Sequence, residues 1–313
     1  MARYAFKRLL AFIPTLLVVT ILVALLMDLI PGDPVQNLVG QEATPELIVQ
    51  RRQELGLDRP LMVRLVEYVT RAARGDLGTS FFLSKSVTET ILSRYQVTLS
   101  FALLSLCISV TLGVTVGIVA AVYQGRPADW SVMGVTMLFI SLPDFWLSLN
   151  LIFFFAVTMK WMPVGGFVPI TQNVGQFFIH IILPALGLGL GGAAFIARYT
   201  RTSMLEVLRQ DYITVAKAKG LRATVVLVRH ALRNAFIPIL TFIGLQFGGM
   251  LGGAAIIETV FAMPGIGRMI ADSIVRRDYP VVQGGILVVT VSYLTVNLLV
   301  DLLYAWIDPR IRY

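Results

Sequence analysis

The run LLAFIPTLLVVTILVALLMDLI (residues 9–30) decides the fold class of this sequence of 313 residues. At about 1.5 Å per residue, a helix of this length crosses a hydrocarbon core of roughly 30 Å. Three basic residues within 1–8 precede the run, and a Pro-Gly-Asp-Pro turn at 31–34 follows it. A cleaved signal peptide has a shorter apolar core that ends in small residues. The run is therefore interpreted as an uncleaved first membrane span.

The composition supports a membrane protein. Hydrophobic residues make up 57% of the chain and charged residues 14%, whereas soluble domains carry about 25% charged residues. The net charge of +8 comes from basic residues that cluster beside apolar runs. Orientation in a membrane explains this placement, so we expect contact with lipid and no nucleic-acid partner. The single cysteine, Cys107, is expected to be a small buried hydrophobic residue.

Five further apolar runs reach membrane length, at residues 97–122, 131–159, 177–197, 236–259 and 281–306. The run at 131–159 is too long for one upright helix and too short for two. Pro143 lies near its middle, where a missing N–H group commonly kinks a helix. One bent span is the simplest interpretation. The sequence thus predicts an all-α integral membrane protein with six transmembrane helices.

Charge placement predicts the topology. Residues 198–235 carry eight basic residues against two acidic ones, and such an excess marks the cytoplasmic side. With six spans, residues 1–8 and 307–313 are then cytoplasmic as well. Residues 31–96 are expected to form a small extracytoplasmic subdomain, with helical periodicity over 45–74 and turns at Gly56 and Gly75. The transmembrane core would cover 97–306, including the cytoplasmic loop 198–235.

Glycines spaced four residues apart recur in the apolar runs, and small residues at this spacing let helix backbones approach closely in lipid. They either tighten a static bundle or form interfaces that slide during transport. The pairs are Gly113 with Gly117, Gly244 with Gly248, and Gly249 with Gly253.

The sequence carries no pattern typical of an enzyme. It lacks the phosphate-binding G-x-x-x-x-G-K-[ST] motif. His180 and His230 lie far apart, and no Cys/His/carboxylate group has the spacing of metal ligands. We therefore expect no catalytic residue, no metal site and no cofactor in this chain.

Four carboxylates lie inside or at the edge of the apolar runs, where acidic residues are costly and are functional candidates by default. Asp28 and Asp301 are interpreted as interfacial or structural acids, because they lie near the ends of spans. Asp144 and Glu258 are candidates for the translocation pathway. Asp144 directly follows Pro143, where freed backbone groups and a water-filled cavity are plausible.

The stretch DYITVAKAKG (211–220) predicts a short helix in the basic loop. Asp211 is a suitable N-cap, and Gly220 can adopt the left-handed conformation that ends a helix. A second helical run is expected over 224–236, leading to Pro238 at the start of the fifth span. The segment could be a plain cytoplasmic loop, an amphipathic helix on lipid, or a helix docked in a groove of a partner. Its small alanines are poor membrane anchors and favour docking.

The run DYITVAKAKGLRATVVLVRHALRNAFIPIL (211–240) resembles the cytoplasmic "EAA" loop of ATP-binding-cassette importer permeases. It is most similar to the branch that imports dipeptides, oligopeptides, nickel and glutathione. The glycine of the motif falls on Gly220 and its proline on Pro238, whereas Thr-Val-Ala at 214–216 replaces Glu-Ala-Ala. Further stretches resemble the first of the two permease subunits of such importers: IPGDPV (30–35), ELGLDRPL (54–61), GDLGTS (75–80), TRTSMLEVL (200–208), FAMPGIGR (261–268), RRDYPVVQGG (276–285) and NLLVDLLYAWIDPRIRY (297–313).

This resemblance implies a type I importer fold and a set of partners in a bacterial inner membrane. A homologous sister permease would complete the pathway as a heterodimer, and two cytoplasmic ATPase subunits would bind ATP and Mg. An extracytoplasmic solute-binding protein would deliver the cargo. The helix at 211–220 would be the coupling helix. The residues expected to couple to the ATPases are Asp211, Tyr212, Val215, Ala216, Ala218, Lys219, Gly220, Leu221, Arg229 and His230.

Other functions remain open at this stage. Peptide-like solutes are the leading cargo, and glutathione, a nickel chelate or a sugar would use the same architecture. A secondary transporter driven by protons through Asp144 or Glu258 is a different class. A membrane scaffold that only anchors cytoplasmic partners is a third.

Overall fold

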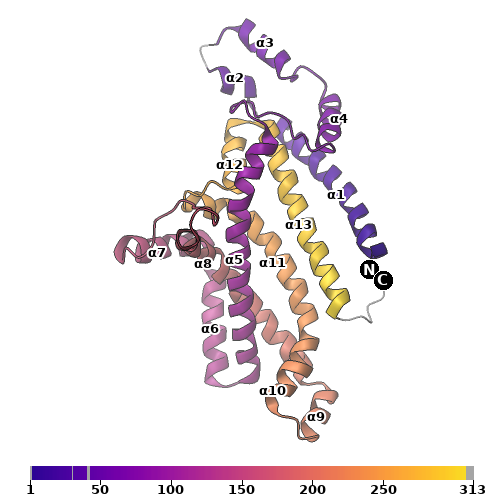
Figure 1. The fold of residues 1–313 in the computed structure, drawn as a ribbon, viewed down its shortest axis with the longest axis vertical. Coiled ribbons are helices and arrows are strands. Elements are labelled where there is room, and N and C mark those ends of the chain that lie inside the picture. The colour runs from indigo at the N-terminus through magenta and orange to yellow at the C-terminus, as the bar shows by residue number, and fades with distance from the viewer. Residues whose placement is uncertain (1, 30, 41–42, 308–313) are drawn as a thin grey trace. The chain divides into compact units, whose positions relative to one another are not determined.

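The computed structural model describes residues 2–29, 31–40 and 43–307, which form helices joined by turns and short loops (Figure 1). Within these ranges, the β structure amounts to one isolated bridge between Thr79 and Ser86. The helices are α1 (Ala2–Leu29), α2 (Pro34–Val39), α3 (Pro45–Glu54), α4 (Leu61–Ala72), α5 (Val87–Val122), α6 (Pro127–Ser141), α7 (Asp144–Leu151), η1 (Ile152–Thr158), α8 (Val174–Leu208), α9 (Asp211–Ala218), α10 (Ala223–Val225), η2 (Val226–Leu232), α11 (Arg233–Val260), α12 (Ile266–Arg276) and α13 (Tyr279–Ile307). The predicted all-α class is confirmed.

Among the described residues, five helices are long and apolar enough to cross a membrane, and a bent pair would make a sixth. The bent pair joins α6 to residues 144–158 and turns by 100° at the break. Leu142 takes an extended conformation there (φ −85°, ψ 128°), because the ring of Pro143 disfavours helical geometry in the residue before it. The break therefore lies where the sequence predicts it, and its angle is larger than that of an ordinary helix kink.

The fifth apolar helix begins earlier than the sequence predicts. In place of a separate helix over 224–236, one helix of 38 residues runs from Ala223 to Val260. It passes through the π-helical segment η2 and keeps Pro238 inside α11. The prediction of a separate second helix was therefore wrong. A proline removes one backbone hydrogen bond, but membrane helices tolerate this loss because neighbouring groups and local π turns satisfy the freed carbonyls.

The chain divides into two compact units. The first contains residues 1–98 and 264–295, and the second contains 99–263 and 296–313. Each unit has its own core. The C-terminal segment that the sequence assigns to the cytoplasm lies outside the described residues from position 308 onward.

In the first unit, helices α3 and α4 occupy the stretch with helical periodicity. Gly56 and Gly75 follow them with φ of +67° and +83°, a left-handed conformation that glycine adopts without strain. The loop at 75–86 is fixed to the turn between α12 and α13. The backbone N–H of Phe81 donates to Asp278 at 3.1 Å, and the Ser80 hydroxyl donates to the same carboxylate.

In the second unit, α5 and α8 approach each other closely at two glycines. A Cβ atom on Gly113 would lie 2.7 Å from the Ala193 carbonyl oxygen, and one on Gly117 would lie 2.6 Å from that of Ala197. This pair thus serves the close packing that its spacing predicts. Gly249 behaves differently, because nothing described lies within 4 Å of its Cβ position.

Cys107 lies on the exposed surface of α5. The prediction that it is buried was therefore wrong. A small apolar side chain in a membrane span can face lipid as readily as protein, so hydropathy alone does not assign its face.

A buried ion pair ties the start of α6 to α8. The Arg201 guanidinium donates two hydrogen bonds to Asp129, from Nε to Oδ1 at 2.6 Å and from Nη2 to Oδ2 at 2.7 Å. The backbone N–H of Gly125 also donates to Oδ2, at 3.0 Å. Asp129 is only 4% exposed. Three hydrogen bonds thus stabilise the negative charge of the buried carboxylate and hold the α5–α6 turn on α8.

We predict that Gly117→Ala destabilises the protein by about 1–3 kcal/mol, because the added methyl group overlaps the α8 backbone. Thermal unfolding of the purified protein in detergent measures the effect. Gly134→Ala is the matched control, since nothing described lies within 4 Å of that Cβ position in α6. Equal melting temperatures for the two variants would contradict the packing described.

Asp129→Asn is predicted to cost about 3 kcal/mol of stability, because it leaves the Arg201 charge without its partner in a largely buried place. Arg59→Gln serves as the comparison. It breaks the exposed pair of Arg59 with Glu67, and exposed pairs contribute about 0–1 kcal/mol. Unfolding in the same detergent should separate the two variants clearly, and a similar small loss in both would refute a stabilising role for the Asp129 pair.

Candidate functional site: the α9 helix

The α9 helix begins one residue earlier than the sequence predicts. Gln210 occupies the N-cap position (φ −74°, ψ 147°), and Asp211 is the first helical residue. The prediction of Asp211 as the N-cap was therefore wrong. Its carboxylate still lies in the first turn, where a negative charge interacts favourably with the helix dipole.

The end of α9 agrees with the sequence. Gly220 has a φ of +76°, as the left-handed closing residue requires. Its N–H donates to the carbonyl of Lys217 at 3.0 Å, and the N–H of Leu221 donates to that of Ala216 at 3.4 Å. These two bonds form a Schellman motif, which satisfies carbonyls that a helix end otherwise leaves unpaired. The helix is thus closed at a defined residue.

One face of α9 is anchored in the core of the second unit. Ile213 and Ala216 are buried in a cluster that also contains Met204 of α8 and Val226 and Ala231 of η2. The first two residues lie three positions apart, so they share one face of the helix. The helix α9 therefore packs against the ends of α8 and of the helix that starts at Ala223. In Figure 1, α9 and α10 lie together beyond the ends of α8 and α11.

The other face of α9 is open. Tyr212, Val215 and Leu221 are exposed apolar side chains, and Lys217 and Lys219 are exposed beside them. The Tyr212 hydroxyl accepts a hydrogen bond of 2.8 Å from Nδ2 of Asn234. The helix therefore presents an apolar and basic face that this chain leaves uncovered.

The ten residues expected to couple to ATPases do not share one environment. Ala216 is buried and belongs to the anchored face, so a partner cannot reach its side chain. His230 is half-buried on η2, and its carbonyl accepts a hydrogen bond from Asn234. The remaining eight are exposed: Asp211, Tyr212, Val215, Ala218, Lys219, Gly220, Leu221 and Arg229.

Sequence reasoning missed the anchor. Ile213 was not among the expected residues, although it and Ala216 have the spacing of a shared helical face. Asn234 was missed as well. Its contact with Tyr212 spans 22 positions, so no local pattern points to it.

The two candidate pathway carboxylates differ in their surroundings. Asp144 is the first residue of α7 and half-buried, and its Oδ1 lies 2.8 Å from the position that a Cβ atom on Gly191 would occupy. One turn further, the Ser148 Oγ lies 2.1 Å from the Cβ position of Gly187. These two polar side chains of α7 thus pack against glycines of α8, where no side chain stands in their way. Glu258 is fully buried near the end of α11.

The described residues contain no group of three or more His, Cys, Asp or Glu side chains placed to hold a metal ion.

The sequence matches the family described as "Binding-protein-dependent transport system inner membrane component" over residues 113–313. The N-terminal family of the same membrane components matches residues 1–102. The chain is 44% identical to the glutathione transport system permease protein GsiC of Salmonella choleraesuis, over 100% of both chains. It is 42% identical to the probable peptide ABC transporter permease protein y4tP of Sinorhizobium fredii, again over 100% of both.

Solved structures show the same fold. A chain of the MetNI methionine ABC transporter in an inward-facing conformation superposes with a TM-score of 0.58 at 18% identity, covering 70% of this chain and 96% of that one. An amino acid ABC transporter gives a TM-score of 0.51 at 18% identity, covering 69% and 93%. The predicted importer permease fold is confirmed.

The chain therefore belongs to the family of inner-membrane components of binding-protein-dependent transport systems: it is a multi-pass permease subunit of an ATP-binding-cassette importer, and not itself an enzyme, since the ATPase activity of such importers resides in partner subunits.

Proposed function

We propose that this chain forms half of the transmembrane pathway of an ATP-driven importer for peptide-like solutes. The names of its full-length relatives support this cargo class. One relative at 44% identity is a glutathione permease, and one at 42% is a probable peptide permease. Glutathione is itself a tripeptide, so both names point to a peptide cargo. A solute-binding protein outside the membrane would deliver them.

The two-faced α9 helix carries the mechanistic part of the proposal. Its open face, with Tyr212, Val215 and Leu221, would dock in a groove of a cytoplasmic ATPase subunit. Its anchored face would pass the movement of that subunit to α8 and to the helix 223–260. A ligand shifts a conformational equilibrium only through contacts that differ between the two states. A rigid helix with one docked and one anchored face provides such a contact.

The remaining parts of the importer lie in other chains. A homologous sister permease would supply the second half of the pathway, most simply as a heterodimer. Two ATPase subunits would bind ATP and Mg and hydrolyse the nucleotide. Residues 198–235 and both termini would lie in the cytoplasm, and residues 31–96 would lie outside.

Asp144 and Glu258 are proposed to contribute to the pathway. For Asp144, support comes from its half-buried position after the 100° bend and from the lack of a hydrogen-bonding partner among the described residues. A carboxylate in such a place can attract the ammonium group of a passing zwitterion. Glu258 is supported by its place in the apolar helix α11, where an acidic residue is costly and a functional candidate by default.

The proposed topology predicts opposite labelling of two introduced cysteines. In a Cys107→Ala background, Lys85→Cys lies in the loop at 75–86 and Arg209→Cys at the end of α8, and both positions are exposed. A membrane-impermeant maleimide should label position 85 in intact spheroplasts. Position 209 should react only after the membrane is opened. Labelling of position 209 in sealed spheroplasts would overturn the orientation.

Val215→Asp is predicted to detach the ATPase subunits and to abolish uptake. Val215 is 52% exposed on the open face, and a docked carboxylate without a partner would lose its hydration. The penalty should lower ATPase copurification by about tenfold or more. ATP-dependent uptake of labelled glutathione or trialanine by the reconstituted importer is the functional measurement.

Val275→Asp on α12 is the matched control, because Val275 is also an exposed valine but lies in the other unit. Its importer should keep its ATPases, and the melting temperature of both variants should equal that of the unchanged protein. If Val215→Asp copurifies with ATPases and transports normally, the proposed role of α9 is wrong. If the unchanged importer carries neither peptide nor glutathione, the proposed cargo class is wrong.

A further inference from the structure

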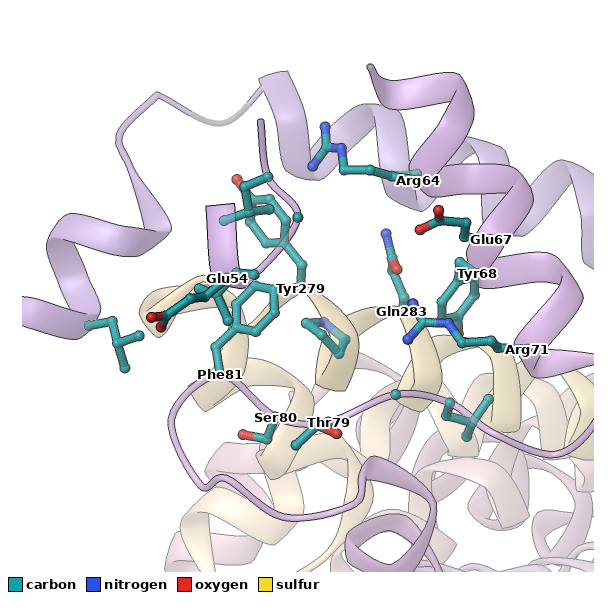
Figure 2. A pocket seen from close by; sticks show the side chains of 18 of the residues that line it. Glu54, Arg64, Glu67, Tyr68, Arg71, Thr79, Ser80, Phe81, Tyr279 and Gln283 are labelled. Carbon is teal, nitrogen blue, oxygen red and sulfur yellow. The ribbon is translucent and has the colours of Figure 1, made fainter. Parts of the chain in front are cut away.

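A cavity of about 630 Å³ lies within the first unit. Helices α3 and α4, the loop at 75–86 and the start of α13 contribute most of its lining. Figure 2 shows Tyr68, Arg71 and Gln283 together on one side, and Phe81, Tyr279 and Glu54 on the other. Ligand pockets for small molecules commonly measure about 300–1,000 Å³. The cavity thus has the size of a site for a short peptide.

The charges around the cavity are unevenly paired. Arg64 donates to Asp28 at 2.6 Å, and Arg51 donates to Glu54 at 2.7 Å. Glu67 accepts from Arg59, which does not line the cavity. Arg71 is exposed, and no acidic side chain among the described residues pairs with it. The lining therefore offers one guanidinium group whose charge the chain does not neutralise.

Two buried donors of residues that line the cavity lack acceptors. The Tyr68 hydroxyl and the Arg64 Nε have no hydrogen-bond partner among the described residues. Tyr68 is only 6% exposed. Burial raises the pKa of its phenol far above the ordinary value, with a smaller opposing effect of Arg71, so the hydroxyl keeps its proton and acts as a donor. Leaving such donors unpaired is costly, and for Tyr68, which lies beside Arg71, an acceptor brought into the cavity would remove this cost.

Two aromatic residues form an apolar part of the cavity lining. Phe81 and Tyr279 pack with their ring centroids 6.3 Å apart, and both line the cavity. Their faces provide an apolar surface for side chains, whereas Glu54 and Glu67 are already paired with Arg51 and Arg59. The lining therefore combines one cationic group with an apolar wall. A free anion such as phosphate would use the guanidinium group but not the rings.

We propose that this cavity is a binding site for a short peptide-like zwitterion, whose carboxylate is held by Arg71 and Tyr68 and whose chain lies against Phe81 and Tyr279. The inference rests on the proposed function, and it places a recognition site for the cargo class on the permease chain itself, outside the pathway carboxylates. Selectivity would then depend on this chain as well as on the solute-binding protein.

Calorimetry on the whole importer in nanodiscs tests the site, with trialanine and trialanine amide as probes and without the solute-binding protein. Trialanine should bind saturably, and the amide should bind at least about tenfold more weakly, because it lacks the charged acceptor. Arg71→Gln should weaken trialanine binding by a similar factor. Arg74→Gln is the matched control, since Arg74 is an exposed arginine three positions away that does not line the cavity.

The variant Tyr68→Phe tests whether the hydroxyl binds peptide or stabilises the fold. The unpaired hydroxyl supports no hydrogen bond in the protein, so its removal should leave the melting temperature unchanged or slightly higher. Trialanine binding should nevertheless fall severalfold. Equal binding of trialanine and its amide, unchanged binding in Arg71→Gln, or no saturable binding at millimolar peptide would each overturn the proposal.

Uptake assays distinguish a failure of the cavity site from a failure of the proposed cargo class. If the importer transports trialanine while Arg71→Gln changes neither binding nor uptake, the cavity site is refuted and the cargo class stands. If the importer transports no peptide yet binds trialanine through Arg71, the cargo class is refuted and the site stands.

Discussion

The burial of Ile213 and Ala216 is the contact on which the placement of α9 depends. These two side chains fix a short helix to Met204 of α8 and to Val226 of η2. Without that anchor, α9 would be a mobile segment, and force applied to its open face would be lost in loop motion. The Schellman motif at Gly220 strengthens the anchor because it ends the helix at a defined residue, so the chain re-enters the membrane helix at Ala223 along a fixed path. The α9 helix is thus anchored on one face and closed at its end.

The second unit stiffens the neighbourhood of this anchor by two different means. At Gly113 and Gly117, the absence of side chains brings the backbones of α5 and α8 together, and dispersion contacts hold them. At Asp129, a carboxylate with three donors fixes the α5–α6 turn to α8 by charge. The first device suits the apolar interior of a membrane, where charges are expensive. The second suits the end of a bundle, where the side chain of Arg201 keeps 24% exposure and part of its hydration.

The sequence predicts those features that local physics determines. Apolar runs become helices because lipid offers no partner for backbone groups, and Gly56, Gly75 and Gly220 take positive φ because turns at those places require it. Features set by tertiary contacts escape prediction. Hydropathy records where a helix meets lipid and not where it ends, so α5 begins at Val87, ten residues before its apolar run. The continuity of η2 with α11, the exposure of Cys107 and the pairing of Asp129 with Arg201 across 72 positions all depend on neighbours that no local pattern names. Within the candidate site, the position of the helix was predictable, but which of its faces is anchored was not.

Unpaired polar atoms distinguish the scaffold from the recognition site. Ser148 Oγ has no conventional partner among the described residues, yet it lies 2.1 Å from the Cβ position of Gly187. On glycine that position is occupied by a hydrogen of Cα, so the oxygen receives a weak Cα–H···O contact, as helix–helix interfaces commonly show. The orphan hydroxyl of Ser148 is therefore a product of close packing and needs no ligand. Arg64 has no such explanation, because its Nε is a donor only and a Cα–H group cannot accept a hydrogen bond. Tyr68 differs as well, since within the described ranges no glycine has its hydroxyl among the nearest neighbours of the Cβ position. Of the buried polar groups that the chain leaves unsatisfied, these two lie at a cavity with an unneutralised guanidinium group, and an acceptor brought from outside is what would satisfy them.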